Sequence, residues 1–304
     1  MGEKQKKNPR VKRRQAMKAR RTLGTLAALV AIALAPASMA EESAPKWDGD
    51  GVIEEGEDET AELARAAQNP VANMYSLPFQ NNTNFNWGLG SVEETQNVLN
   101  IQPVLPFEIT DNWNLITRTI FPIISQPGPI PGMDRETGLG DTTFTAFLSP
   151  SKASKVLWGV GPALLFPTAT DDRLGFDKWG MGPSLVALGM PGNWVVGGLV
   201  NNIWSVGGSG DQKINFFFSQ VFANYNLSDG WYLISAPIIT SNWKGGSGDK
   251  WTVPVGGGVG KIFRIGKLPP MNANIQGYYN ATRPDIVGRW SMRFQFQLMF
   301  PKRR

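Results

Sequence analysis

The most regular chemical feature of this sequence is a series of amide residues placed at every second position of short segments. Asn82, Asn84 and Asn86 are spaced in this way, and so are Asn274 and Gln276. Because successive side chains of a β-strand point to opposite faces, the amides of each series share one face. Amides both donate and accept hydrogen bonds, so a surface lined with them could bind polar solute or form a wet passage. The residues predicted to line that interior surface are Asn82, Asn84, Asn100, Gln102, Asn114, Arg118, Asp141, Asn274, Gln276, Arg293 and Gln295.

The same residues have a second interpretation. A narrow closed barrel also fills its interior with polar groups that hydrogen-bond one another, and such filling needs no solute. Arg118 and Asp141 lie on neighbouring predicted strands, so an internal ion pair between them is expected, and pairs of this kind often only support a barrel interior. The sequence leaves the passage and the packed interior open as alternatives.

Other residues with chemical potential argue against an enzyme. The chain contains no His and no Cys, so it lacks the usual general base, the Ser-His-Asp triad, most zinc sites and thiolate ligands. Residues 256–261 have the glycines of a phosphate-binding loop, but Val255 stands where the motif needs a glycine, and a strand pattern follows where it needs a helix. The carboxylates of Asp171, Asp172 and Asp177 fit a solvated loop better than a cation site. We therefore expect no catalytic residues, no cofactor and no metal.

The elements that position these side chains are predicted to be β-strands. The clearest is Trp290–Phe300, in which large apolar residues alternate with Ser, Arg and Gln. A strand of this kind suits a transmembrane barrel, where one face meets lipid and the other a wet interior. The sequence therefore predicts an all-β, antiparallel transmembrane barrel of about 12 strands, closed by the C-terminal strand. The strands are expected at about 79–89, 95–107, 112–124, 139–149, 155–168, 178–190, 193–206, 212–226, 231–243, 251–265, 270–281 and 289–300.

The connections between these strands alternate between short and long. Tight turns at 110–112, 191–193 and 228–230 are each followed by a Trp, whereas connections such as 126–137 and 169–178 are longer. Short turns at one rim and long loops at the other are typical of outer-membrane barrels, with the short turns in the periplasm. Tryptophans near both strand ends predict two aromatic bands at the membrane interfaces. We expect Trp113, Trp158, Trp194 and Trp231 at the short turns, and Trp87, Trp179, Trp204, Trp243, Trp251 and Trp290 at the long loops.

Prolines inside the predicted strands oppose this architecture. Each proline removes a donor from the ladder, and a closed barrel has no free edge on which to place it. Bulges or kinks would be needed to accommodate them. The residues concerned are Pro103, Pro122, Pro162, Pro167, Pro183, Pro237 and Pro254.

The N-terminal residues are predicted to lie outside the barrel. An apolar run at 23–35 follows a basic block and precedes small residues, so residues 1–40 are predicted to be a secretory signal peptide. Residues 41–69 are predicted to be an acidic, disordered lead-in with a short helix, and residues 70–304 to be the outer-membrane barrel. Ten of the 30 basic residues but one of the 25 acidic residues lie in the first 40. The mature chain is therefore mildly acidic, and no nucleic-acid partner is expected.

Several blocks of the sequence resemble a family of bacterial outer-membrane proteins. Its members are labelled transporters of the meta-pathway of phenol degradation or, misleadingly, neuromedin U. The resemblance covers residues 69–302 and implies a barrel of about a dozen strands in the bacterial outer membrane. It implies transport in general and assigns it to no particular residue. The blocks that carry the resemblance include N-P-V-A at 69–72, S-L-P-F-Q-N-N at 76–82, G-L-G-D at 138–141, F-P-T-A-T at 166–170 and P-V-G-G-G-V-G-K at 254–261.

Two functions are favoured for this architecture, and a third, a membrane-embedded hydrolase, is disfavoured because the chain contains no His. The first is an outer-membrane channel or transporter for small solutes, with aromatic or weakly polar compounds as candidates and residues 69–80 entering the barrel as a partial plug. The second is a structural or partner-binding barrel with a filled interior, in which the acidic residues 41–62 reach a periplasmic partner. The expected partners are membrane lipid, lipopolysaccharide and the outer-membrane assembly machinery, together with an unidentified small solute in the first case.

Overall fold

The structure is a computed structural model that describes residues 59–89, 94–130, 132–152, 154–209, 213–246 and 250–301. The predicted signal peptide, residues 1–40, and the acidic residues 41–58 lie outside the described residues. Among the residues described, no helix is long and apolar enough to cross a membrane.

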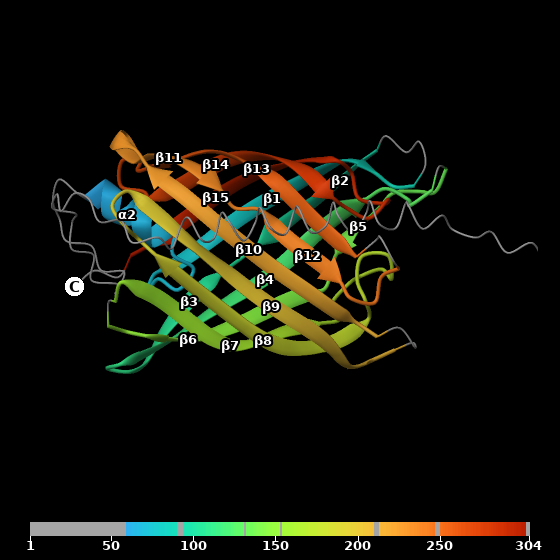
Figure 1. The fold of residues 1–304 in the computed structure, drawn as a ribbon, viewed down its shortest axis with the longest axis horizontal. Helices are drawn as coiled ribbons and strands as arrows, with labels where there is room; N and C mark the ends of the chain where they lie inside the picture. The colour runs from blue at the N-terminus through green and yellow to red at the C-terminus, as the bar shows by residue number, and fades with distance from the viewer. Residues whose placement is uncertain are drawn as a thin grey trace, which may run out of the picture. The chain divides into compact units, whose positions relative to one another are not determined.

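The described residues form fifteen β-strands in one antiparallel sheet that closes on itself (Figure 1). Strand β15 pairs with β1, and β9 pairs with β10, so the sheet closes, and every described strand except β5, which pairs with β4 alone, pairs on both sides. Within the described residues, helix α2 (Glu59–Ala67) precedes the sheet, and a short 3₁₀ turn, η1 (Ser228–Gly230), follows β10. The strands are β1 (Tyr75–Trp87), β2 (Glu94–Ile101), β3 (Val104–Thr110), β4 (Trp113–Gln126), β5 (Glu136–Leu139), β6 (Thr142–Pro150), β7 (Val156–Phe166), β8 (Lys178–Gly189), β9 (Trp194–Gly208), β10 (Asn215–Asn226), β11 (Trp231–Ser235), β12 (Ile238–Asn242), β13 (Trp251–Phe263), β14 (Met271–Thr282) and β15 (Trp290–Phe300).

Three crossings of the barrel wall are each made of two strands separated by a gap of two residues. These interrupted crossings are β2 with β3, β5 with β6, and β11 with β12. When each is counted once, the wall has twelve antiparallel crossings. The predicted twelve-stranded barrel and its closure by the C-terminal strand are therefore confirmed. The first strand begins at Tyr75, a few residues earlier than predicted.

Most of the prolines named above lie where the ladder tolerates a missing donor. Pro103 and Pro237 occupy two of the three interruptions. Pro254 lies at a register shift in the pairing of β13 with β14. Pro162 and Pro183 stand opposite each other on β7 and β8, so two missing donors are gathered at one position of the ladder. An interruption or a register shift thus accompanies Pro103, Pro237 and Pro254, whereas Pro167 follows the end of β7 and Pro122 lies within β4 opposite Asn100.

The interruption between β11 and β12 keeps its backbone hydrogen bonds through side chains. The N–H of Ala236 donates to the Tyr278 hydroxyl at 3.0 Å, and Arg293 Nη1 donates to the Ala236 carbonyl at 2.7 Å. Inside a membrane an unsatisfied backbone group costs several kcal/mol, because lipid offers no replacement partner. Tyr278 and Arg293, on strands β14 and β15, therefore satisfy the backbone of Ala236 where the ladder is interrupted.

The outer surface of the wall is apolar. Along the strands, exposed large hydrophobic side chains alternate with buried residues. In β15, for example, the exposed Met292 and Phe294 flank the buried Arg293. The same alternation places Leu185 on the outside of β8. An apolar belt of this kind suits contact with acyl chains.

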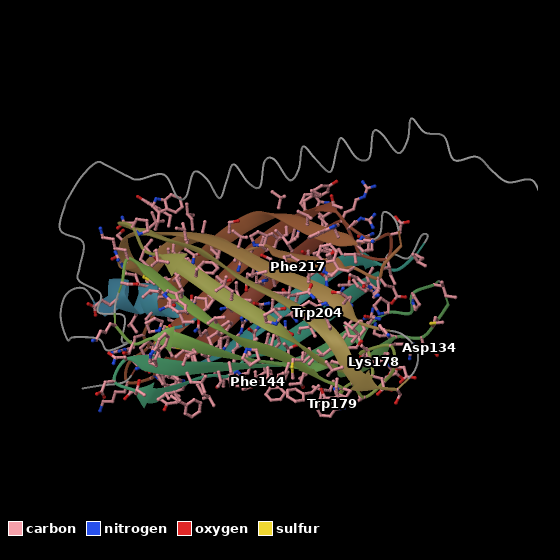
Figure 2. All side chains as sticks on the ribbon, turned by 60° about the horizontal axis from the view of Figure 1, so that its bottom comes forward. Asp134, Phe144, Lys178, Trp179, Trp204 and Phe217 are labelled. Atoms are coloured by element: carbon pink, nitrogen blue, oxygen red, sulfur yellow. The ribbon has the colours of Figure 1, made fainter. Side chains whose placement is uncertain are left out.

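Aromatic side chains gather at the two ends of this belt. At the short turns Trp113 packs edge-on against Trp158, with ring centroids 6.0 Å apart. At the long loops Trp243 and Trp251 lie 5.3 Å apart, also edge-on. Figure 2 shows Lys178 and Trp179 at the same end of the barrel as the loop that carries Asp134. The structure thus has aromatic contacts at both interfaces, as the spacing of the tryptophans predicts.

The glycines of β13 permit close packing inside the barrel. A Cβ added at Gly260 would lie 2.2 Å from the ring of Tyr232, the residue directly opposite on β11. Tyr232 is almost fully buried, and its hydroxyl donates to Asn272 at 2.6 Å. The glycines therefore serve packing in a strand, in agreement with the rejection of a phosphate-binding loop at this segment.

We expect the substitution Gly260→Val to displace the Tyr232 ring and to lower the free energy of unfolding by about 1–3 kcal/mol, the usual range for overpacking. The matched control is Gly277→Ala on β14, because a Cβ there meets no atom within 4 Å. Urea unfolding in lipid vesicles measures both variants. Equal losses of stability in the two would contradict this assignment of Gly260.

Candidate functional site

The short-turn end of the barrel is filled by the helix α2 and the following residues 68–74, which together we call the plug. In Figure 1, α2 lies at the end of the barrel toward which β10 points. Leu63, Ala64 and Ala66 pack in one cluster with Ile262 and Met299, which face the interior from β13 and β15. Alanine and leucine favour the helix, and their spacing gives it one small apolar face for this contact.

The plug is held by contacts that reach across the barrel. Arg65 Nη2 donates to the carbonyl of Gly192 at 2.7 Å, and Gln68 Nε2 donates to Asn226 Oδ1 at 2.8 Å. Val71 is buried among interior side chains of several strands, including Ile116 on β4 and Val186 on β8. The plug therefore joins opposite walls through the barrel interior.

The predicted range of the plug was partly wrong. Residues 69–74 do enter the barrel, but residues 75–80 belong to the wall, because β1 begins at Tyr75 and pairs with β15 from that residue onward. Ser76, Pro78 and Gln80 still face the interior as alternate residues of the strand.

One wall of the interior is lined with amides that hydrogen-bond one another. On β14, Gln276 Nε2 donates to Asn274 Oδ1 at 2.7 Å, and Asn274 Nδ2 donates to the Tyr232 hydroxyl at 3.2 Å. Farther round the barrel, Asn84 Nδ2 donates to Gln96 Oε1 at 2.7 Å. Since these amides satisfy one another, this wall is consistent with a packed interior as much as with a passage.

The opposite part of the interior contains a cavity of about 410 Å³. Strands β4, β9 and β10 supply its apolar wall through residues such as Ile120, Leu199, Phe216 and Phe218. The loop after β7 covers it with residues 174–176. The polar side chains that reach the cavity are Arg118, Asp141, Thr143, Thr145 and Asn201.

The predicted ion pair between Arg118 and Asp141 is wrong. The Asp141 carboxylate accepts hydrogen bonds from the backbone N–H of Phe176 at 2.6 Å and of Ala169 at 3.3 Å. Arg118 instead donates to the side-chain oxygen of Gln102, at the gap between β2 and β3. Asp141 therefore holds the covering loop in place, and the guanidinium group of Arg118 bonds to the neutral amide of Gln102.

The predicted interior residues divide into four groups. Arg118 and Asp141 border the cavity, and Gln102 accepts from Arg118. Gln295 and Asn100 stand opposite Gln80 on its two neighbouring strands, in a single amide layer. Asn114 is buried near the short turns, and its Oδ1 has no hydrogen-bond partner among the described residues. The remaining predicted residues, Asn82, Asn84, Asn274, Gln276 and Arg293, belong to the hydrogen-bonded wall.

Arg293 has a fuller set of contacts than Arg118. Its Nε donates to Asn82 Oδ1 at 2.9 Å, and its guanidinium carbon lies 5.1 Å from the centre of the Tyr278 ring. Together with the bond to the Ala236 carbonyl, these contacts hold the side chain against the wall. Arg293 therefore serves the wall, whereas Arg118 faces the cavity.

The apolar residues of the cavity are the part of the site that sequence reasoning missed. The segment N-F-F-F-S-Q-V-F of β10 has large apolar side chains on both faces, so alternation does not reveal which face is interior. The pairing of β10 with β9 places Phe216 and Phe218 beside Ile203 and Asn201, which are buried. Only this register identifies them as lining residues.

The carboxylates of the long loops form ion pairs at the rim. Arg173 Nε lies 3.2 Å from Asp171 Oδ1, and Arg173 also contacts Glu136. The backbone N–H of Arg173 donates to the same carboxylate and lowers the pKa of Asp171 below its ordinary value. Arg135 pairs with Glu94 at 2.9 Å. Asp171 is thus engaged with an arginine of its own loop.

No protein-family model matches the chain, and no curated protein matches it. The crystal structure of an outer membrane channel from Pseudomonas putida F1 is similar with a TM-score of 0.55 at 16% sequence identity, covering 75% of this chain and 94% of that chain. Outer membrane phospholipase A from Escherichia coli gives a TM-score of 0.41 at 14% identity, covering 83% and 98% of the two chains. The CymD monoaromatic hydrocarbon channel gives 0.41 at 9% identity, covering 84% and 95%.

The first of these similarities establishes the fold as that of an outer-membrane barrel. The apolar belt and the aromatic contacts at both of its ends are the features with which such a barrel sits in the bacterial outer membrane. The outer wall therefore contacts membrane lipid, including lipopolysaccharide in the outer leaflet.

Proposed function

We propose that this protein is an outer-membrane channel for small solutes, with aromatic or weakly polar compounds as the candidate class. The observation that carries the proposal is the cavity of about 410 Å³ inside the barrel, which has an apolar wall and a few polar groups. Sites for small organic molecules commonly combine these two features. A barrel of twelve strands is also wider than one of eight, whose interior its own side chains just fill.

The location of the cavity supports a path along the barrel axis. It lies between the long-loop residues 174–176 and the interior cluster that contains Val71 of the plug, since Leu199 belongs to both. A solute that entered from the long-loop side would reach the cavity first and the plug second. In this proposal the plug controls the last step toward the periplasm.

A second candidate function is a structural or partner-binding barrel that transports nothing. The plug and the mutually satisfied amides favour it, because both fill space in the interior. In that case residues 41–62 would reach a periplasmic partner, and their deletion would abolish its capture.

We also propose that the chain belongs to the family labelled with the meta-pathway of phenol degradation, because it has sequence blocks such as N-P-V-A at 69–72 and P-V-G-G-G-V-G-K at 254–261. In this proposal the outer-membrane assembly machinery recognises the aromatic C-terminal strand, and the protein has no catalytic role.

Reconstitution in planar bilayers tests the channel function. We expect discrete single-channel conductance from the wild type. Because Arg118 borders the cavity, Arg118→Ala should lower the ratio of anion to cation permeability by about twofold or more. The control is Arg135→Ala, which removes a charge from the exposed rim pair with Glu94. Absence of both conductance and solute flux in liposome swelling would refute the channel and leave the filled barrel.

A further inference from the structure

Arg118 is a charged group with an incomplete set of partners. A guanidinium group stays protonated in proteins and offers five N–H donors. Among the described residues, the side-chain acceptor that Arg118 reaches is the neutral Gln102. Within the part of the chain that the structure describes, the ion pairs involve Arg135 and Arg173 at the rim, and none of them includes Arg118.

Among the described residues, no acidic side chain forms an ion pair with Arg118. Arg293 is close enough for its positive charge to act on Arg118, so the two arginines reinforce the same sign in the interior. Asp141 borders the same cavity, but its carboxylate oxygens accept from the backbone of Phe176 and Ala169. The cavity therefore presents an arginine that forms no ion pair with the described residues, in surroundings of low polarity where an ionic contact is strong.

The rest of the cavity offers a surface for an apolar group. Leu199, Phe216 and Phe218 line it from β9 and β10, and Ile120 follows Arg118 on the same face of β4. The volume of about 410 Å³ is within the range of sites for small organic ligands. A ligand that satisfies both parts must carry one anionic head and one apolar tail.

We infer that this cavity binds amphipathic monocarboxylates, with the carboxylate on Arg118 and the tail against the apolar wall of β9 and β10. A carboxylate matches the planar fork of a guanidinium group with two parallel hydrogen bonds. The inference deepens the proposed channel function, on which it rests, by naming the class of solute that the cavity selects. Aromatic acids of one ring and short alkanoates fit the space, whereas dicarboxylates would place a second charge against the apolar wall.

Calorimetric titration of the protein in lipid nanodiscs tests the site. The probes are 4-phenylbutyrate and its neutral counterpart 4-phenylbutan-1-ol, with empty nanodiscs to subtract partition into lipid. We expect wild type to bind the acid about tenfold or more tightly than the alcohol, as one charge-assisted bidentate contact implies. Arg118→Met keeps an unbranched apolar stem without the charged head, and it should remove this preference by weakening binding of the acid alone.

Two further variants make the result specific. Arg118→Lys retains the charge without the fork and should recover part of the preference. Arg135→Met, at the rim pair with Glu94, should leave both affinities unchanged. The heat-dependent shift in gel mobility that folded barrels show verifies that each variant is folded, and the comparison of acid with alcohol in wild type needs no variant at all.

Equal binding of acid and alcohol by wild type, or an unchanged preference in folded Arg118→Met, would overturn the inference. Conductance in bilayers without acid-selective binding would refute this site and leave the channel standing. Acid-selective binding without conductance would support this site and refute the channel.

Discussion

Deleting residues 59–74 should raise the single-channel conductance of the reconstituted barrel several-fold. The plug fills the short-turn end, where Leu63, Ala64 and Ala66 pack against Ile262 and Met299 of the wall. The wall itself begins at Tyr75, so the deletion removes no strand. A barrel of twelve strands has more interior than its inward side chains can fill, and water and ions should then occupy the vacated space.

A disulfide provides the converse experiment. The chain contains no Cys, so Val71→Cys combined with Gly159→Cys introduces one possible pair. A Cβ added at Gly159 would lie 3.2 Å from Val71 Cγ1, which is near the separation that a disulfide requires. We expect the oxidised protein to conduct no more than wild type, and reduction to restore the wild-type level.

These two results together test whether the plug limits the passage of ions through the barrel. If the deletion variant folds and conducts like wild type, or if the oxidised double variant conducts like the deletion variant, then the plug does not limit passage. The proposed path from the cavity to the periplasm would have to be abandoned in either case.

Tyr278→Phe should lower the free energy of unfolding by about 1–3 kcal/mol, the usual consequence of leaving a buried polar group unsatisfied. The variant removes the hydroxyl that accepts the N–H of Ala236 at the gap between β11 and β12. Both residues are buried, so water does not readily replace the lost acceptor. Urea unfolding in lipid vesicles measures the loss.

The neighbouring residue supplies the control. Tyr279 faces outward with 39% of its surface exposed and packs its ring against Trp290. Tyr279→Phe keeps that ring contact, so we expect a change within about 0.5 kcal/mol. A loss in Tyr279→Phe as large as in Tyr278→Phe would show that the hydroxyl of Tyr278 does not support the interruption.

Most of the barrel could be predicted because its signals are local. Alternation along a strand such as β15 depends only on neighbouring residues, and partition between lipid and interior acts on each strand separately. The tight turns and their tryptophans are equally local, and the twelve crossings were predicted on this basis. The prolines were the exception, since whether a strand can break at Pro103 or Pro237 depends on side chains from neighbouring strands.

The site was less predictable because polarity alone does not reveal what a side chain contacts. Alternation identified Arg118 and Asp141 as interior residues, but their partners are Gln102 and the backbone of the covering loop. Alternation also did not show which face of β10 points to the interior, because Phe216 and its neighbour Phe217 are both apolar. The apolar half of the cavity was therefore invisible until the register with β9 was known.

The sequence by itself determined the kind of wall: two-faced strands, bands of tryptophan and closure by the last strand, all of which follow from the preference of each short segment for lipid or water. Only the tertiary structure decided what lies inside that wall. Arg293 and its partner Asn82 are 211 residues apart in the chain, and Gln68 and Asn226 are 158 residues apart. Contacts over such separations depend on how the closed sheet brings distant strands face to face, and no pattern within one segment encodes that geometry.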